Sequence, residues 1–186
     1  MHLSVSAFIS IDCGLAANAS YTEESTGIIY ISDAAFIDSG ISESIFSGFK
    51  DIQQPQLSSL RSFPQGIRNC YSINITKGTK YLIRATFLYG DYDGQNKLPQ
   101  FDLYLGPNMW DSVKVKNVSL SMSKELIHMP TLNYIQVCLV NTGSGTPFIS
   151  AIELRPLPNT TYVTEYGSLA LYIRKDRGSI SNHSYR

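Results

Sequence analysis

Charged residues are scarce in this chain of 186 residues. They make up 16% of it, and the 15 Lys and Arg balance the 15 Asp and Glu, whereas about 25% is typical of soluble domains. Sparse and balanced charge excludes the basic surface that nucleic acids require and the cationic face that binds anionic membranes. The sequence also lacks a run of about 18 apolar residues, so it predicts no membrane-spanning helix.

The usual catalytic and metal-binding patterns are missing as well. There is no G-x-S-x-G nucleophile motif and no zinc spacing of Cys and His, because the three histidines are far apart: His2, His128 and His183. Paired carboxylates of a glycosidase, Asp91 or Asp93 with Asp102, are the one hydrolytic arrangement left open. The sequence therefore predicts a non-catalytic chain without a cofactor or a metal ion.

Cysteine is also rare, with three residues. An odd number allows one internal disulfide at most. Cys70 and Cys138 each lie on the more polar face of a long strand pattern, where a bridge between them is plausible. Cys13 is then buried or paired outside this chain. The alternative is three buried free thiols.

N-glycosylation sequons are abundant by contrast. Five Asn-x-Ser/Thr triplets occur, none with Pro: Asn18, Asn74, Asn117, Asn159 and Asn182. Roughly two would be expected by chance, so the excess favours a secreted protein. The start of the chain, MHLSVSAFISIDCG, lacks the basic region of a signal peptide. We therefore expect a fragment of a longer secreted protein.

Strand patterns dominate the chain, without amphipathic helices between them. Alternation is clearest in 81–88, where Tyr81, Ile83, Ala85 and Phe87 share one face, and again in Phe101–Leu105. Many short strands bounded by turn residues predict an all-β, antiparallel β-sandwich. The expected strands are Ala7–Asp12, Ile28–Ser32, Leu60–Phe63, Cys70–Ile75, Tyr81–Tyr89, Phe101–Leu105, Val113–Leu120, Ile135–Val140 and Phe148–Leu154.

The regular strand pattern of the sequence ends at Pro156-Leu157-Pro158. Residues 158–186 carry two sequons and cannot close a domain by themselves. We therefore expect one lobe over residues 1–157, and over 158–186 a linker with the start of a second module.

An aromatic and acidic loop follows the strand at Tyr81. Tyr89, Asp91, Tyr92 and Asp93 fall together at one rim of a sheet. Flat rings beside carboxylates suit a sugar or a peptide. Asp and Gly also form turns without any binding role. A cation loop is the third interpretation, although the further ligands of an EF-hand are missing.

Three other conspicuous side chains have structural interpretations. Trp110, the single Trp, is better explained as an anchor of the sandwich core than as a sugar platform. Arg61 and Arg84 lie within strand patterns, where we expect pairing with Asp residues and not contact with a ligand.

Six collinear blocks resemble the malectin-like extracellular region of plant leucine-rich-repeat receptor-like kinases. They are FISIDCG, TGIIYISDAAFIDSG, RSFPQGIRNCY, YLIRATFLYGDYDGQNKLPQFDLYLGPNMW, CLVNTGSGTPFISAIELRPL and YVTEYGSLALYIR, between Phe8 and Arg186. In that family two malectin-like lobes precede leucine-rich repeats, a membrane span and a cytoplasmic kinase. The resemblance implies a jelly-roll-like β-sandwich, here the first lobe and the beginning of the second.

The resemblance also implies a site. The aromatic pair with which malectin binds sugar matches Asp91 and Tyr92, with Tyr89 nearby. The earlier sugar-contacting tyrosines of malectin fall in regions too divergent to align, and Tyr30 is the candidate counterpart of one of them. The Asp of malectin that precedes Asn-Pro is absent, because this chain has Gly145-Thr146-Pro147. One of the two aromatics is likewise replaced by a carboxylate.

Two hypotheses follow for the function. The first is a lobe outside the plasma membrane that binds a carbohydrate or a peptide. The second is an interaction lobe that packs on its twin lobe and on a co-receptor protein without a small ligand. In both, the membrane is reached only through segments that this chain lacks.

Overall fold

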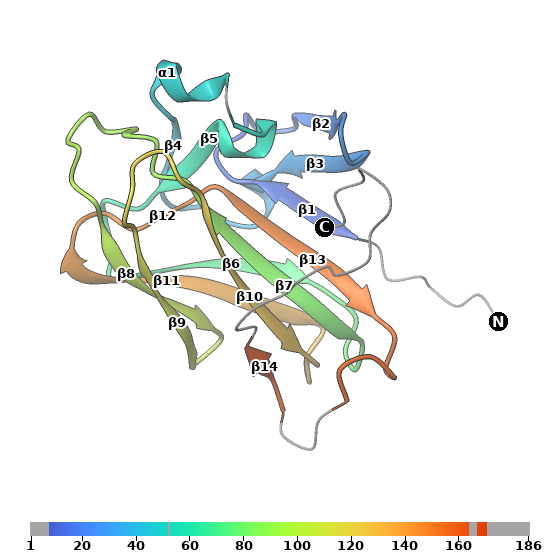
Figure 1. Cartoon of the computed structure of the whole chain (residues 1–186). Coiled ribbons are helices and arrows are strands. Elements are labelled where there is room, and N and C mark those ends of the chain that lie inside the picture. Colours follow the sequence, from blue (N-terminus) through green and yellow to red (C-terminus); the bar gives the residue numbers. More distant parts are fainter. Residues whose placement is uncertain (1–7, 52, 164–166, 171–186) are drawn as a thin grey trace.

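The structure is a computed structural model that describes residues 8–51, 53–163 and 167–170, which form a β-sandwich (Figure 1). One sheet has seven strands, in the order β14 (Leu169–Ala170), β10 (Met122–His128), β7 (Lys80–Phe87), β13 (Ala151–Leu157), β1 (Ile9–Asp12), β3 (Ile28–Ser32) and β2 (Ser20–Glu23). The second sheet has four, in the order β6 (Arg68–Asn74), β11 (Tyr134–Ser144), β8 (Gln100–Leu105) and β9 (Asn108–Lys114).

A small third sheet and three short helices lie toward one end of the sandwich. The sheet has the order β12 (Phe148–Ile149), β5 (Ser59–Ser62) and β4 (Ile41–Ser44). The helices are η1 (Asp33–Ala35), α1 (Ser47–Lys50) and η2 (Pro55–Leu57). Within the described residues, no helix has the length and apolar character needed to cross a bilayer.

Strand pairing confirms the expected antiparallel all-β architecture. Every described pairing is antiparallel except that of β1 with β3. In the centre of the large sheet Ile9 is the register partner of Leu154, and Ala151 is the partner of both Asp12 and Thr86. The start of β1 and the end of β13 therefore lie at one end of the sheet, and the end of β7 lies at the other.

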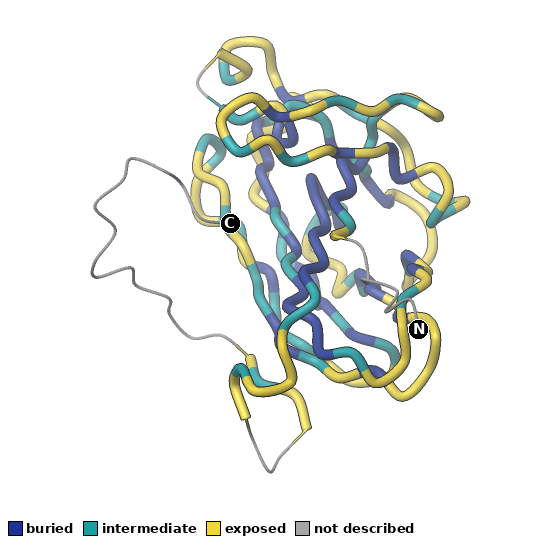
Figure 2. The backbone as a smooth tube through the Cα atoms, turned by 90° about the vertical axis from the view of Figure 1, so that its right-hand side faces the viewer, coloured by how far each residue is buried: buried dark blue, intermediate teal, exposed yellow. Residues whose placement is uncertain are grey.

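The core fills the space between the two main sheets, and Figure 2 shows that the strands of the sandwich carry most of the buried residues. The alternation that the sequence shows in β7 and β8 is present: Ile83, Ala85 and Phe87 are buried, as are Phe101 and Leu103. These side chains join one apolar cluster with residues of β6, β11 and β13. Removal of this apolar surface from water is the main stabilising contribution.

Several expected strands differ from the observed ones. The strand expected over Val113–Leu120 was wrong, because β9 ends at Lys114 and a loop follows. The run expected over Phe148–Leu154 is divided at Ser150, whose hydroxyl accepts a hydrogen bond from the backbone N–H of Leu88. The strands β2, β4 and β10 were not expected.

A disulfide joins Cys70 of β6 to Cys138 of β11. The two residues are direct register partners, so the bridge crosses between neighbouring strands of the four-stranded sheet. Cys13 is a buried free thiol, and burial raises its pKa well above the usual value. All three cysteines lie in the described residues: two of them form the disulfide, and the third is a free thiol in the core.

The boundary expected at residue 157 coincides with the end of β13. Beyond it, Leu169 and Ala170 form β14 and pair with Ile127 and Leu126 of β10. A short part of the expected linker thus extends the sheet of the lobe, while 164–166 and 171–186 lie outside the described residues. The division into two modules remains a prediction.

Two buried carboxylates lie where β1, η1 and β5 meet. Asp33 is fully buried and accepts hydrogen bonds from Nη2 of Arg61 at 2.7 Å and from the hydroxyl of Tyr71 at 2.9 Å. Asp12 is 1% exposed, and its carboxylate accepts from the hydroxyls of Tyr21 and Ser59. Asp33 thus has a cationic partner, whereas Asp12 is bonded to two neutral hydroxyls.

The burial of Asp12 predicts a pH-dependent stability. Burial raises its pKa from 3.8 to about 6, so the folded protein holds this proton more tightly than the unfolded chain. Stability should therefore fall as pH rises from about 4 to about 6, by about 3 kcal/mol from this group, and then level off. Urea unfolding of the wild type and Asp12→Asn at pH 4 to 7 measures the difference. If the free energy of unfolding depended on pH in the same way in both proteins, the prediction would be contradicted.

Candidate ligand rim

The residues 88–99 form the loop between β7 and β8, at the end of the large sheet opposite the start of β1. Gly90 fixes this loop, since its N–H donates to the carbonyl of Val118 and its carbonyl accepts from the N–H of Phe46. Its φ is 54°, and a Cβ at this position would lie 2.4 Å from Cγ2 of Ile45. Glycine is therefore required for the close contact.

Tyr89 and Asp93 hold each other within the loop. The Tyr89 hydroxyl donates to a carboxylate oxygen of Asp93 and accepts from the N–H of Lys97. The ring is 1% exposed and packs against Tyr92 and Phe148, with centroid distances of 5.5 and 6.0 Å. The Tyr89 ring therefore supports the loop from the side of the core and is not accessible to a ligand.

Both carboxylates of the loop take part in its turns. Asp91 has a φ of 48° and accepts a 2.7 Å hydrogen bond from the N–H of Asn96. Asp93 accepts a 3.1 Å bond from the N–H of Gln95. The turn interpretation thus accounts for much of the Asp91–Gly94 pattern, although Asp91 is only partly covered and Asp93 is exposed. Within the described residues, no three His, Cys, Asp or Glu side chains are placed to hold a metal ion.

Tyr92 is the aromatic residue of the loop that remains accessible. It is half-buried, and its ring lies 5.8 Å from that of Phe148. Its hydroxyl is hydrogen-bonded to Thr146 and Ser62, and burial raises its pKa. Thr146 belongs to the loop in which malectin has its sugar-binding Asp, so the structure brings both sequence-matched segments together. Ser62 was not singled out from the sequence, and Thr146 was named there only as part of the segment that lacks the Asp of malectin.

Tyr30 occupies a different environment. Its ring is fully buried in β3 and stacks on Tyr21 at 5.7 Å, and its hydroxyl donates to Glu153. Neither of these contacts belongs to the rim. As a fully buried ring, Tyr30 could touch a ligand only after the surrounding side chains had moved.

The other conspicuous side chains have structural roles. Trp110 is partly buried and packs against the core from β9. Arg61 pairs with Asp33, as expected of a buried arginine. Arg84 pairs with two glutamates, Glu125 at 2.6 Å and Glu153 at 3.1 Å, and not with the Asp residues that we expected.

Asp102 is placed apart from the turns of the rim loop. It lies in β8 and accepts a 2.6 Å hydrogen bond from the hydroxyl of Ser112 in β9. The described contacts of Asp91 and Asp93 are within their own loop.

The sequon asparagines that the structure describes are all exposed: Asn18, Asn74, Asn117 and Asn159. Asn182 lies outside the described residues. Exposure is what attachment of a glycan requires, so nothing in the described part of the chain hinders modification at these four positions.

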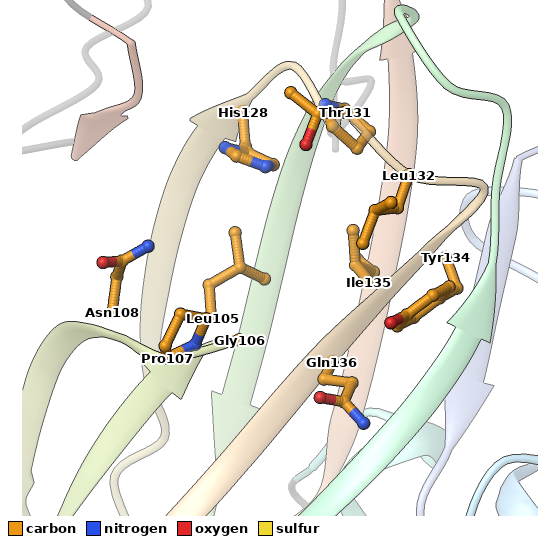
Figure 3. A pocket seen from close by; sticks show the side chains of 11 residues that line it. Leu105, Gly106, Pro107, Asn108, His128, Thr131, Leu132, Tyr134, Ile135 and Gln136 are labelled. Carbon is orange, nitrogen blue, oxygen red and sulfur yellow. The ribbon is translucent and has the colours of Figure 1, made fainter.

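A hollow of about 320 Å³ lies at the other end of the sandwich (Figure 3). Its lining includes Leu105, Pro107, Leu132 and Ile135, with His128 at its edge. Burial lowers the pKa of His128. No sequence pattern pointed to this hollow, because its residues come from two separate stretches of the chain, 105–108 and 128–136. The rim residues Tyr89, Asp91, Tyr92 and Asp93 do not line this hollow.

Comparison with known proteins agrees with this architecture. The sequence model of the malectin-like domain matches residues 11–186. The chain is 52% identical over 181 residues to the LRR receptor-like serine/threonine-protein kinase IOS1 of Arabidopsis thaliana, which covers 97% of this chain and 20% of that protein. The chain thus spans about a fifth of the length of this curated relative.

Solved structures show the same fold. The ANX2 ectodomain from Arabidopsis thaliana superposes with a TM-score of 0.72 at 14% identity, over 82% of this chain and 43% of that one. The plant receptor-like kinase FER gives 0.65 at 18% identity, over 85% and 44%.

The described fold is a jelly-roll-like β-sandwich of the kind found in plant receptor ectodomains. The chain belongs to the malectin-like domain family. The resemblance carried by the six sequence blocks is thereby confirmed.

Proposed function

We propose that this chain is a non-catalytic recognition lobe in the extracellular part of a plant receptor-like kinase, and that it contacts a carbohydrate or peptide ligand through the rim. Its similarity to receptor kinases over a fifth of their length supports a place within the ectodomain, with the kinase elsewhere in the longer protein. The two-lobe arrangement, with a boundary near residue 157, belongs to the same proposal.

The placement of Tyr92 carries the proposal. Its ring is backed by Phe148 and held through its hydroxyl by Thr146 and Ser62. A ring that is fixed before binding loses little conformational entropy when a ligand packs on it. The partly exposed carboxylate of Asp91 lies one residue away and can accept hydrogen bonds from sugar hydroxyls or peptide N–H groups.

The buried Tyr89 and Tyr30 modify this proposal. They cannot provide a second open aromatic face in the described conformation, so a sugar would stack on one ring only. This favours shallow contact with a chain of sugars or an extended peptide over a deep monosaccharide pocket.

Tyr92→Ala is expected to weaken ligand binding at least tenfold, since it removes the only accessible ring of the loop. Secreted protein would be titrated against panels of cell-wall oligosaccharides and peptides by calorimetry. Tyr104→Ala is the matched control, because Tyr104 is also a half-buried tyrosine but lies on the four-stranded sheet under Arg68. Thermal melting would show that both variants remain folded.

The second candidate is an interaction lobe that packs on its twin lobe and on a co-receptor. Exposed apolar residues at the end opposite the rim favour it, among them Met129 and Leu132, which are 50% and 53% exposed. Absence of binding to both panels, or binding that Tyr92→Ala leaves unchanged, would reject the rim and leave this candidate.

A further inference from the structure

A predicted glycosylation site lies directly opposite an exposed aromatic ring on the outer face of the four-stranded sheet. Asn74 ends β6 and Tyr134 begins β11, and the two are register partners. Asn74 is exposed, and Tyr134 is 44% exposed. A large ring left open to water beside a sequon is the observation to be explained.

The disulfide fixes this pairing. Cys70 and Cys138 are register partners on the same two strands, four residues away from Asn74 and Tyr134 along each strand. A slip of one residue would move every side chain of a strand to the other face of the sheet. The covalent bridge prevents such a slip, so Tyr134 remains opposite Asn74.

The hydrogen-bond pattern brings the two side chains close. The N–H of Ile75 donates to the carbonyl of Asn133 at 2.9 Å, which makes Ile75 and Asn133 a hydrogen-bonded pair. The next pair, Asn74 and Tyr134, is therefore a non-hydrogen-bonded one. In such pairs the side chains approach most closely, with Cβ atoms about 4.5–5 Å apart.

This spacing suits a sugar attached to Asn74. The first N-acetylglucosamine of an N-linked glycan is joined to the Asn side-chain nitrogen and has one face made largely of C–H groups. Such a face packs on the negative face of an aromatic ring and also removes apolar ring surface from water. Figure 3 shows the Tyr134 ring at the edge of the hollow, near Leu132 and Gln136.

We propose that Tyr134 is the platform on which the first sugar of an Asn74-linked glycan packs, and that this sugar covers the adjacent edge of the hollow. The glycan then stabilises the β6–β11 pair and keeps the outer face of the four-stranded sheet from serving as a protein interface. The role of Tyr134 is distinct from that of the rim, so the two proposals can fail separately.

Asn117 provides an internal comparison. Its side-chain oxygen accepts hydrogen bonds from the N–H and the hydroxyl of Ser119, and it follows β9 in a loop, without a cross-strand register partner among the described pairings. A glycan at Asn117 should therefore gain nothing from Tyr134.

The experiment uses the full chain, secreted from a eukaryotic host, with all sequon asparagines except Asn74 changed to Gln. Peptide mass mapping first measures occupancy of Asn74. Thermal melting is then recorded with the whole glycan, with the single sugar left by an endoglycosidase, and with no sugar after amidase treatment. The same series is run on Tyr134→Ala, Tyr134→Leu and Tyr134→Phe, and on a chain that retains Asn117 alone.

One sugar should suffice for the full effect. Its removal is expected to lower the melting temperature by about 2–4 °C in the wild type and in Tyr134→Phe. Tyr134→Leu and Tyr134→Ala should show no such difference, and neither should the Asn117-only chain. An unmodified Asn74, or an equal loss with and without the aromatic ring, would overturn the proposal. The Leu variant keeps apolar bulk, so the test does not depend on the Ala variant remaining folded.

Discussion

Replacing both Cys70 and Cys138 by Ser is expected to lower the free energy of unfolding by about 4 kcal/mol. The two residues are separated by 68 positions, and a bridge over a loop of that length restricts the unfolded chain by about this amount in the chain-entropy model. The same loop contains β7, β8, β9 and β10, so the bridge limits the ensemble available to much of the sandwich.

Equilibrium unfolding in urea, with and without a reductant, measures this effect. The wild type with reductant should approach the double variant. Cys13→Ala is the control, because Cys13 is a buried free thiol and its replacement removes one small side chain without changing the bridge. Equal urea midpoints for the wild type and the double variant would disprove the prediction.

Asp33→Ala is expected to destabilise the fold by about 3–5 kcal/mol, because it leaves a largely buried guanidinium without its counter-charge. The Arg61 side chain is 11% exposed and that of Asp33 is fully buried. The substitution also removes the acceptor of the buried hydroxyl of Tyr71. The unpaired guanidinium, together with the hydroxyl that loses its acceptor, explains the size of the effect.

A surface ion pair provides the comparison. Lys124 and Asp111 are joined at 2.6 Å, but the Asp111 side chain is 45% exposed, so Asp111→Ala should cost at most about 1 kcal/mol. Both variants would be measured by denaturant unfolding in the same buffer. If Asp33→Ala and Asp111→Ala lowered the free energy of unfolding by similar amounts, burial of the Arg61–Asp33 pair would not be the reason for its contribution to stability.

Patterns on the central strands could be read from the sequence because the physical signal there is local. In β7 and β8, every second residue is apolar and faces the core, and the residues between them face outward. This two-residue period is typical of a strand with one buried face. β10 was missed for the converse reason. Its face toward the second sheet includes Lys124 at a partly exposed position, where Asp111 of β9, 13 positions earlier, compensates the charge. A charged residue on that face interrupts the apolar alternation of the strand.

The rim shows the same limit. The sequence placed Tyr89, Asp91, Tyr92 and Asp93 in one loop, and the structure gathers them there. Which of the rings faces solvent depends on Phe148 and Thr146, which are more than 50 residues away along the chain. The burial of Tyr30 likewise depends on its stacking with Tyr21 and its bond to Glu153. Tertiary contacts of this kind decide accessibility, and residue type alone does not.

The register of β1 with β13 has a mechanical consequence. Ile9 and Leu154 are partners, so β1 starts and β13 finishes side by side. Tension applied outward on these two strand ends would open their ladder one hydrogen bond after another, and would not load all the bonds together. The lobe should thus yield at low force between its ends, while the loop that contains Tyr92, at the far end of β7, lies outside the path of the load.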